Sequence, residues 1–231
     1  HYLDTVGVTG SIPVSPTHPA SKGIYMGRVV VLGLGRSGIA AAQLLNAEGH
    51  QVTVFESNGQ GKFQALSAEL TAQGIEIELD KPLEMASFRP WLDQLERVVV
   101  SPGIFWDNPT LITLRDRGVI VQGEMAIAWN SLKHVPWVCI TGTNGKTTVT
   151  HLLNHILKSS GIEAPMGGNM GLAASKLALE IKKAEAKQPD VLVMELSSYQ
   201  IEAAPEISPF IGIWTNLTSD HLERHGSLEN Y

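Results

Sequence analysis

Cysteine is nearly absent from this sequence, whose 231 residues contain a single one, Cys139. One thiol excludes an internal disulfide framework and is typical of a reducing compartment, so we expect a cytoplasmic protein. Because Cys139 lies in the apolar run WVCI, we interpret it as a buried core thiol rather than as a nucleophile.

A surplus of positive charge is also missing, since the formal net charge is −6. General nucleic-acid binders usually carry a basic surplus, so we expect no nucleic-acid partner. No apolar run approaches the roughly 18 residues that span a bilayer, and we expect no membrane association. What is present is globular: 43% hydrophobic and 17% charged residues, over a length that suits about two domains.

The first 25 residues have neither the basic start nor the continuous apolar core of a signal peptide. They are rich in Ser, Thr, Pro and Gly, which predicts a disordered leader, and Met26 is a candidate natural start. At the other end the sequence stops at Tyr231 in the middle of a pattern, so we expect a fragment.

Past Met26, short β-branched runs alternate with helical patterns. Parallel strands need a crossover connection and a helix supplies it, so the alternation predicts an α/β fold with parallel sheets. The apolar runs are continuous, as expected for strands that are covered on both faces. We expect strands at 28–32, 52–55, 97–101, 119–122, 137–141, 190–195 and 210–215, and helices near 39–49, 62–73, 109–117, 123–132, 146–159 and 171–187.

The segment 131–136 carries no strong periodicity and ends in proline, and we interpret it as a linker. Two α/β units of roughly 100 residues each would lie on either side of it, which is a usual size for a domain. The prediction is a disordered leader over 1–25, a Rossmann-like parallel-sheet domain over 26–132 and a P-loop-type α/β ATP-binding domain over 133–231, truncated on its C-terminal side.

The run GLGRSG at 33–38 satisfies G-x-G-x-x-G, follows a strand and opens a helix. Glu56 ends the next strand, in the position of the acid that binds a ribose hydroxyl in dinucleotide-binding folds. The pattern recognises a diphosphate flanked by a ribose but does not say which nucleoside is attached. NAD or FAD, another nucleoside diphosphate such as a UDP-linked compound, and a turn without a ligand all stay open.

A second loop follows at the same expected sheet edge. The run SPG at 101–103 ends a strand and puts Ser101 and the Gly103 backbone where ligands of open α/β sheets collect. A Pro-Gly turn without a ligand is the alternative.

The run TGTNGKTT at 141–148 follows an apolar strand and precedes an amphipathic helix, which is the context of a phosphate-binding loop. Standard Walker A spacing has a further glycine where this sequence has Ile140, so the run is a shorter version of the Walker A loop. Glycines let N–H groups converge on phosphate oxygens, Lys146 would meet the β- and γ-phosphates, and the Thr147 hydroxyl would hold Mg²⁺. The expected ATP-binding residues are Gly142, Thr143, Asn144, Gly145, Lys146, Thr147 and Thr148.

Apolar residues recur at helical spacing after this loop. The predicted buried stripe of the helix comprises Val149, Leu152, Leu153, Ile156 and Leu157. His151 and His155 are spaced like a zinc pair, but they point away from this stripe and Leu152 stands where the zinc motif has Glu. We interpret both histidines as solvated.

Three further residues lie at expected strand ends or turns. Glu195 ends the strand at 190–195, and a carboxylate there, beside a phosphate loop, is the usual second ligand for Mg²⁺. The segment NLTSDHLERHG puts Asp220 and His221 at the same edge, although a histidine in a loop is ordinarily a surface residue. The turn GGNMG at 167–171 offers the Asn169 amide, or is only a turn.

These pieces, in this order, resemble the ATP-dependent Mur ligases of peptidoglycan synthesis, over about residues 27–231. In that family TGTNGKTT, the GGN turn, a strand-end glutamate and a TN…DH segment recur together. Within it, ELSSYQIE at 195–202 is most similar to the members that add D-glutamate to UDP-N-acetylmuramoyl-L-alanine.

The resemblance implies a reaction in which ATP phosphorylates the substrate carboxylate and the amine of D-glutamate attacks the acyl phosphate. It implies catalytic roles for Lys146, Glu195 and His221. Separately, we expect a monomer. Thr147, Glu195 and His221 would be the Mg²⁺ ligands, at two metal sites in the full-length enzyme. The residues implied to bind the UDP-sugar substrate are Gly35, Arg36, Ser37, Glu56, Ser57, Ser101, Gly103 and Asn169.

The family also has a carbamylated lysine that bridges the metals and a third domain that closes over ATP, both beyond Tyr231. We therefore expect the 231-residue chain to bind the UDP substrate weakly and not to ligate. Related enzymes often have aspartate where this sequence has Glu56. Two alternatives stay open: an NAD-dependent oxidoreductase that uses GLGRSG, which leaves the GKT loop and Glu195 unexplained, and a non-catalytic nucleotide-binding module.

Overall fold

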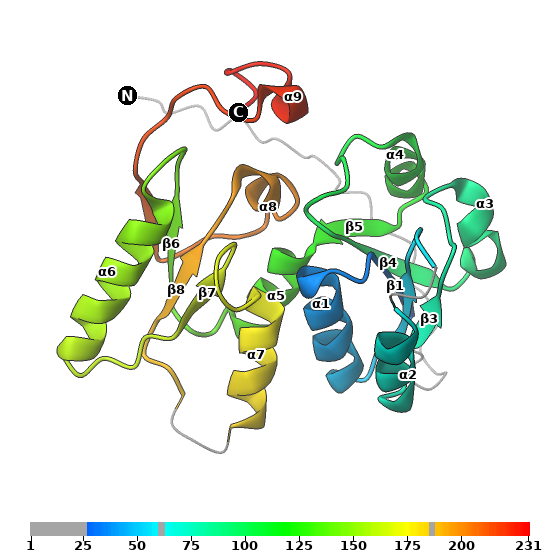
Figure 1. Ribbon diagram of the computed structural model, residues 1–231, viewed down its shortest axis with the longest axis horizontal. Helices are drawn as coiled ribbons and strands as arrows, with labels where there is room; N and C mark the ends of the chain where they lie inside the picture. The colour runs from blue at the N-terminus through cyan, green and yellow to red at the C-terminus, as the bar shows by residue number, and fades with distance from the viewer. Residues whose placement is uncertain (1–26, 60–62, 185–187) are drawn as a thin grey trace, which may run out of the picture.

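The computed structural model describes residues 27–59, 63–184 and 188–231, which form two parallel β-sheets with helices packed around them (Figure 1). The α/β fold that the alternating pattern predicts is confirmed. The leader predicted over 1–25 lies outside the described residues.

The first sheet has the strand order β3-β2-β1-β4-β5, with every pairing parallel. The direction of the order reverses at β1, which lies between β2 and β4, so the loops after β1 and β4 open side by side at this switch point. The strands are β1 (Arg28–Leu32), β2 (Gln51–Phe55), β3 (Glu76–Glu78), β4 (Leu95–Val100) and β5 (Ile120–Gly123). The helices are α1 (Arg36–Ala47), α2 (Gln64–Ala72), α3 (Met85–Phe88), the 3₁₀ turn η1 (Arg89–Trp91) and α4 (Pro109–Asp116).

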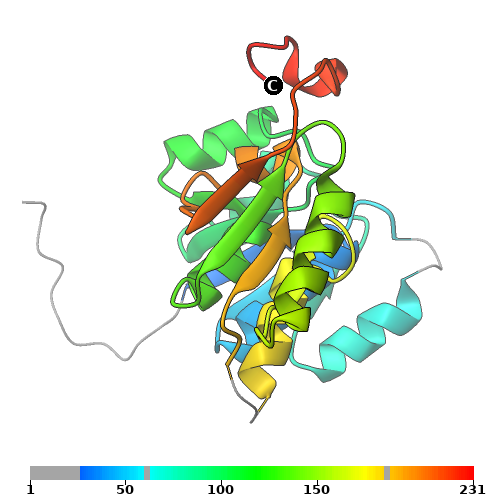
Figure 2. The ribbon, with the colours of Figure 1, turned by 90° about the vertical axis from the view of Figure 1, so that its left-hand side faces the viewer.

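The second sheet has the order β7-β8-β6-β9, again with parallel pairings, and α6 covers one of its faces (Figure 2). Its strands are β6 (Trp137–Thr141), β7 (Met166–Gly168), β8 (Leu192–Glu195) and β9 (Ile211–Trp214). The helices that follow them are α6 (Lys146–Ser159), α7 (Ala174–Lys183), α8 (Ser198–Glu202) and α9 (Leu222–His225).

Helix α5 (Glu124–Leu132) joins the two sheets and packs with α1 and α7 between them (Figure 1). A single cluster of buried side chains runs from Val31 and Ala41 through Leu132 to Trp137 and Leu177. The segment 131–136, interpreted as a linker, begins inside α5 and contributes Leu132 to this shared core. The change of sheet falls between β5 and β6, and the division into domains at residue 132 stays a prediction.

The buried face of α6 is narrower than the sequence predicts. Leu152 and Ile156 are 58% and 52% exposed, so their assignment to the buried stripe is wrong. The fully buried positions are polar, Thr150 and Asn154, and Asn154 Nδ2 donates to the Ala164 carbonyl at 2.5 Å. The spacing of apolar residues could not predict this buried face, because the side chains at its centre are polar and form hydrogen bonds.

Other interpretations of single residues are confirmed. Cys139 is buried, and burial raises the pKa of its thiol to about 12, so it stays protonated in the core. His151 and His155 are exposed. Helix α7 starts later than predicted, and the residues 185–187 of the predicted helix lie outside the described ones.

Gly38 lies in the first turn of α1, where an added Cβ would be 2.0 Å from the Gly33 carbonyl oxygen. Alanine normally stabilises a helix over glycine by about 1 kcal/mol. We expect Gly38→Ala instead to lower the free energy of unfolding by about 1–3 kcal/mol, because α1 must move away from the glycine loop. Denaturant unfolding measures the change.

Gly35→Ala is the matched control for this prediction, since no atom lies within 4 Å of a Cβ added at Gly35. Its free energy of unfolding should stay within about 0.5 kcal/mol of the parent value. Equal effects of the two substitutions would contradict the proposed packing of α1 on the loop.

Candidate active site

The glycine loop after β1 is held in place by Glu56, which follows β2. Glu56 Oε2 accepts from the Leu34 N–H at 2.9 Å, and Oε1 accepts from the Asn58 N–H at 3.0 Å. Gly33 has φ +95° and donates its N–H to the Phe55 carbonyl at 2.7 Å. The acid predicted to face a ribose therefore also fixes the shape of the loop.

The other residues predicted to bind the UDP-sugar lie at the same sheet edge. Ser101 Oγ donates to the Leu32 carbonyl at 2.5 Å, which joins the ends of β4 and β1. Gly35, Arg36 and Ser57 are exposed, and Ser37 is half-buried in the first turn of α1. Gly103 has no atom within 4 Å of an added Cβ, so the SPG backbone is open at this edge.

Arg36 connects this edge to the second sheet. Its Nη1 donates to the carbonyl of Gly171, in the loop between β7 and α7, at 3.3 Å. Asn169 lies in the same loop. The two glycine-rich loops therefore lie close together although they are more than a hundred residues apart in the sequence.

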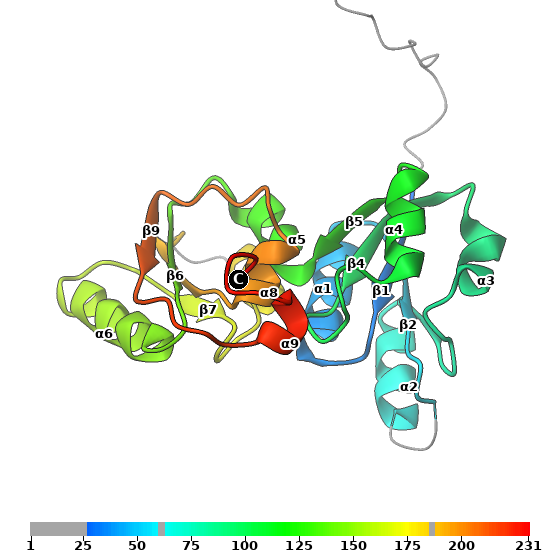
Figure 3. The same ribbon diagram turned by 90° about the horizontal axis from the view of Figure 1, so that it is seen from above.

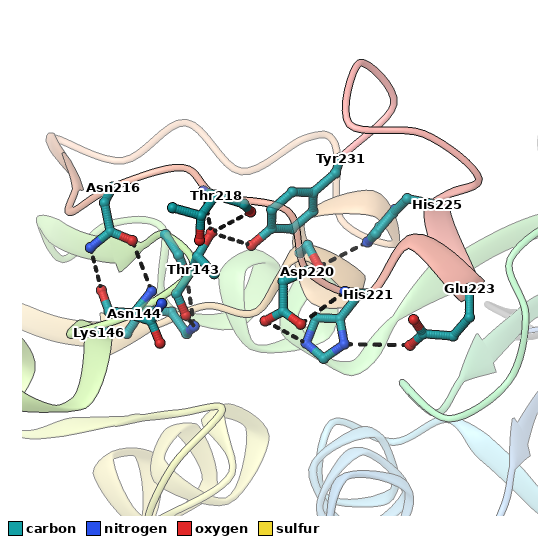
Figure 4. Close-up of polar contacts among 12 residues, drawn as sticks. Thr143, Asn144, Lys146, Asn216, Thr218, Asp220, His221, Glu223, His225 and Tyr231 are labelled. Atoms are coloured by element: carbon teal, nitrogen blue, oxygen red, sulfur yellow. Dashed lines mark hydrogen bonds and ion pairs between the residues drawn. The ribbon is translucent and has the colours of Figure 1, made fainter.

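The TGTNGKTT loop connects β6 to α6 through two glycines with positive φ, Gly142 at +132° and Gly145 at +83°. A Cβ on Gly142 would be 2.2 Å from Thr215 Oγ1, so only glycine fits there. Lys146 Nζ donates to the carbonyls of Gly142 at 2.7 Å and Thr143 at 2.9 Å (Figure 4). The ammonium group thus lies over the loop, at the N-terminus of a helix, where anions bind favourably.

The segment after β9 braces this loop (Figure 4). Asn216 Oδ1 accepts from the Asn144 N–H and Asn216 Nδ2 donates to the Asn144 carbonyl, both at 3.0 Å. Thr143 donates its N–H to the Asn216 carbonyl at 3.0 Å, and the Thr218 N–H donates to Thr143 Oγ1 at 3.0 Å. Sequence reasoning missed Asn216 and Thr218 as parts of the site, although the TN pair directly after a strand was a signal.

Because Asn216 takes the N–H groups of Thr143 and Asn144, a phosphate must use those of the first turn of α6. The first four N–H groups of a helix have no partner within it. Thr147 is half-buried and Thr148 exposed in this turn.

Glu195 ends β8, directly beside the start of the phosphate loop, since its pairing partner in β6 is Ile140. The residue is 1% exposed. Its Oε1 accepts from Asn169 Nδ2 at 2.9 Å, and its carbonyl accepts from the Asn169 N–H at 2.8 Å. Its buried Oε2 has no hydrogen-bond partner among the described residues.

A buried carboxylate oxygen without a donor is costly unless a cation lies beside it. Glu195 Oε2 therefore fits the role of a magnesium ligand. Within the ranges that the structure describes, no three His, Cys, Asp or Glu side chains form a cluster that could hold a metal ion. Mg²⁺ usually takes one or two carboxylates together with water and substrate phosphates.

His221 lies at the N-cap of α9 with the left-handed φ of +50°. Its ring nitrogens lie 3.6 Å from Asp220 and 3.6 Å from Glu223 (Figure 4). Its ring centroid is 5.1 Å from that of Tyr199. In the described part of the chain no hydrogen bond or ion pair joins His221 to Lys146 or Glu195. The structure therefore brings Lys146 and Glu195 to adjacent strand ends and leaves His221 on a neighbouring segment.

The serine and the glutamine of the segment ELSSYQ cap the start of α8. Ser197 caps α8: its hydroxyl accepts from the Gln200 N–H at 3.3 Å, and Gln200 Oε1 accepts from the Ser197 N–H at 3.0 Å. This S-x-x-Q capping box places the N-cap two residues after Glu195 and starts the helix at Ser198, which fixes the end of β8. None of the helices in the described ranges is long and apolar enough to cross a membrane.

Residues 27–123 match the family described as the Mur ligase MurD-like N-terminal domain, and residues 140–231 match the Mur ligase middle domain. The chain is 66% identical over 206 residues to UDP-N-acetylmuramoylalanine–D-glutamate ligase of Prochlorococcus marinus (strain MIT 9313), a match covering 89% of this chain and 45% of that protein. It is 47% identical to the ligase of the same name from Synechocystis sp., covering 89% of this chain and 44% of the relative. The chain thus spans about half the length of these curated relatives.

A solved structure supports the fold. The UDP-N-acetylmuramate:L-alanyl-gamma-D-glutamyl-meso-diaminopimelate ligase from Neisseria meningitides matches 88% of this chain and 64% of its own, with a TM-score of 0.53. The sequence identity is 17%, so the likeness concerns the fold alone.

Proposed function

This chain belongs to the Mur ligase family, and we propose that it forms the substrate-binding and ATP-binding parts of the ligase that adds D-glutamate to UDP-N-acetylmuramoyl-L-alanine in peptidoglycan synthesis. One observation carries the proposal: the Lys146 loop lies at the strand end beside Glu195, whose Oε2 is buried and has no hydrogen-bond partner in the described chain. An ATP-dependent ligase needs a phosphate loop with a carboxylate ligand for the metal beside it. An NAD-dependent oxidoreductase needs neither.

The UDP diphosphate would lie on the glycine loop after β1, with Ser37, Glu56 and Ser57 toward the uridine. The position of this loop at the switch point of the first sheet supports this, because ligands of open α/β sheets bind there. The contact from Arg36 to Gly171 supports a substrate that extends from the first sheet toward the second. Asn169, in the same loop as Gly171, would contact its sugar end.

The proposed reaction starts with transfer of the γ-phosphoryl group of ATP to the substrate carboxylate. The amine of D-glutamate then attacks the carbonyl carbon of the acyl phosphate, and inorganic phosphate leaves as the amide bond forms. Two anions must approach each other in the first step, so the protein acts mainly by holding and neutralising them. Lys146 would exchange its loop carbonyls for the β- and γ-phosphates, and the N–H groups of the first turn of α6 would donate to the same oxygens.

Thr147 and Glu195 would hold one Mg²⁺, and His221 would help to hold a second. When bound, the metal supplies positive charge that lets the γ-phosphate and the carboxylate approach. Asn169 prepares Glu195 for this role, because its amide occupies Oε1 and leaves Oε2 for the cation.

We further propose that the protein acts in the cytoplasm as a monomer. Its substrate-binding unit would be 26–132 and its ATP-binding unit 133–231. The buried, protonated Cys139 suits a reducing compartment. The change of sheet between Gly123 and Trp137 supports the division.

Titration calorimetry of the chain with UDP-N-acetylmuramoyl-L-alanine and with NADH tests the proposal. We expect heat of binding with the UDP substrate and none with NADH. NADH binding without UDP-substrate binding would instead support the oxidoreductase.

A further inference from the structure

Arg224 in α9 is a nearly buried arginine outside the residues assigned so far. Its side chain is 8% exposed, and Nη2 pairs with Glu202 Oε2 of α8 at 3.1 Å. The guanidinium carbon lies 4.8 Å from the ring centroid of Tyr199 and 5.0 Å from that of Phe105. The group is thus held by an ion pair and by two aromatic rings, which are favourable partners for a flat cation.

The two rings come from different parts of the fold. Tyr199 belongs to α8, beside the second sheet, whereas Phe105 lies in the loop after β4 of the first sheet, four residues beyond Ser101. Figure 3 shows α9 next to α8, at the junction of the two sheets. Arg224 therefore bridges the loop after β4, whose Ser101 and Gly103 are predicted to bind the UDP substrate, and the segment that carries His221.

The loop after β4 is also held by α4, the helix that follows it in the chain. Arg115 of α4 donates from Nη2 to the Trp106 carbonyl at 2.9 Å and lies 4.0 Å from the centroid of the Trp106 ring. Burial lowers the pKa of Arg115, and the negative charges of Glu202 and Asp107 oppose that effect. Glu202 thus interacts with two arginines: it forms an ion pair with Arg224 of α9, and its charge acts on Arg115 of α4.

Arg224 also lies three residues after His221 and shares Tyr199 with it, since the His221 ring is 5.1 Å from the same tyrosine ring. Helix α9 has a single turn, and a helix this short has little stability of its own. Its position must therefore come from side-chain contacts. The contact of Arg224 with Phe105 reaches the loop after β4 of the first sheet.

We propose that Arg224 is a positioning residue that couples the two ligand sites through its contact with Phe105. The inference rests on the proposed function. A UDP substrate that fixes the loop 101–108 fixes Phe105, and Phe105 then fixes Arg224 and the His221 segment against the phosphate loop. Each ligand therefore raises the affinity for the other by the same factor, as linkage requires.

Calorimetric titration of MgATP, without and with saturating UDP-N-acetylmuramoyl-L-alanine, tests this coupling. We expect the UDP substrate to raise the MgATP affinity of the parent chain by about fivefold or more. Phe105→Ala should bind each ligand alone as the parent does and lose the coupling, so that the ratio falls to about one. A purely structural role of Arg224 would leave that ratio unchanged, since Phe105→Ala keeps the Glu202 and Tyr199 contacts.

Two further variants sharpen the experiment. Phe105→Tyr keeps an aromatic face and should restore the coupling. Phe210→Ala removes a 77% exposed ring next to β9 and serves as the matched control, with the coupling unchanged. Phe105 itself is 54% exposed, so its removal leaves the core intact.

The outcomes separate the inference from the function on which it rests. If both ligands bind the parent chain and the coupling is absent, or survives in Phe105→Ala, the inference is wrong while the proposed function stands. If the parent chain binds no UDP substrate, the proposed function is wrong and the inference is lost with it.

Discussion

Lys146→Ala should remove most of the MgATP affinity of this chain and leave the affinity for UDP-N-acetylmuramoyl-L-alanine unchanged. The Lys146 ammonium lies 2.7 and 2.9 Å from two carbonyls of its own loop, which places it directly at the proposed phosphate position. Removing one partner of a desolvated charge pair costs about 2–5 kcal/mol. The expected loss of MgATP affinity is therefore about 30-fold or more.

Titration calorimetry with MgATP measures the effect, and a thermal melt checks that the variant is folded. Lys158→Ala is the matched control, because Lys158 lies in the last turn of the same helix and is exposed. It should bind MgATP as the parent chain does. Equal losses in the two variants would show that net charge, and not the loop, governs the affinity.

Glu124→Gln should remove a pH dependence of stability worth about 3 kcal/mol. Glu124 is a fully buried residue in the first turn of α5, between the two sheets. Its Oε1 accepts from the Ser175 N–H at 2.5 Å, and its Oε2 has no hydrogen-bond partner in the described ranges. Burial raises the pKa of Glu124 from 4.5 to about 7.

Because folding raises the pKa of Glu124, this residue makes the stability fall as the pH rises. Below a pH of 4.5 the carboxyl is protonated in both states and its burial carries no ionisation penalty. As the pH rises from 4.5 to about 7, the unfolded chain loses this proton while the folded chain keeps it, so stability falls across that window and then levels off. The shift of about 2.5 units is worth about 3 kcal/mol.

Denaturant unfolding at about pH 5 and about pH 8 measures the difference. The parent chain should lose about 2.5 kcal/mol more than Glu124→Gln between these two conditions, because part of the effect is already present at about pH 5 and the other titrating groups are common to both. Glu69→Gln, at an exposed position of α2, is the control and should keep the parent's pH dependence. Parent-like behaviour of Glu124→Gln would contradict the burial of an ionisable group at this junction.

Sequence reasoning located the parts of the site that follow directly from strand ends. Continuous apolar runs fix where β1 and β6 lie, so the positions of GLGRSG and TGTNGKTT at strand ends were predictable. The same logic placed Glu195 at the end of β8. Parallel pairing then brings these ends to common sheet edges.

Contacts between distant segments were not predictable. The Asn216 brace on the phosphate loop and the Phe105–Arg224 contact join residues whose separation depends on how the two sheets pack. Glu124 looks in the sequence like an ordinary acid in a first helical turn, where it would favour the helix dipole. Its burial follows only from the packing of α7 across α5.

The central claim is that the glycine loop after β1 binds the UDP substrate while the phosphate loop after β6 binds ATP, both at the same time. The most direct measurement is the stoichiometry of MgATP binding to the chain already saturated with UDP-N-acetylmuramoyl-L-alanine. The account predicts one equivalent of each ligand bound together. Displacement of either ligand by the other would show a single shared site and contradict it.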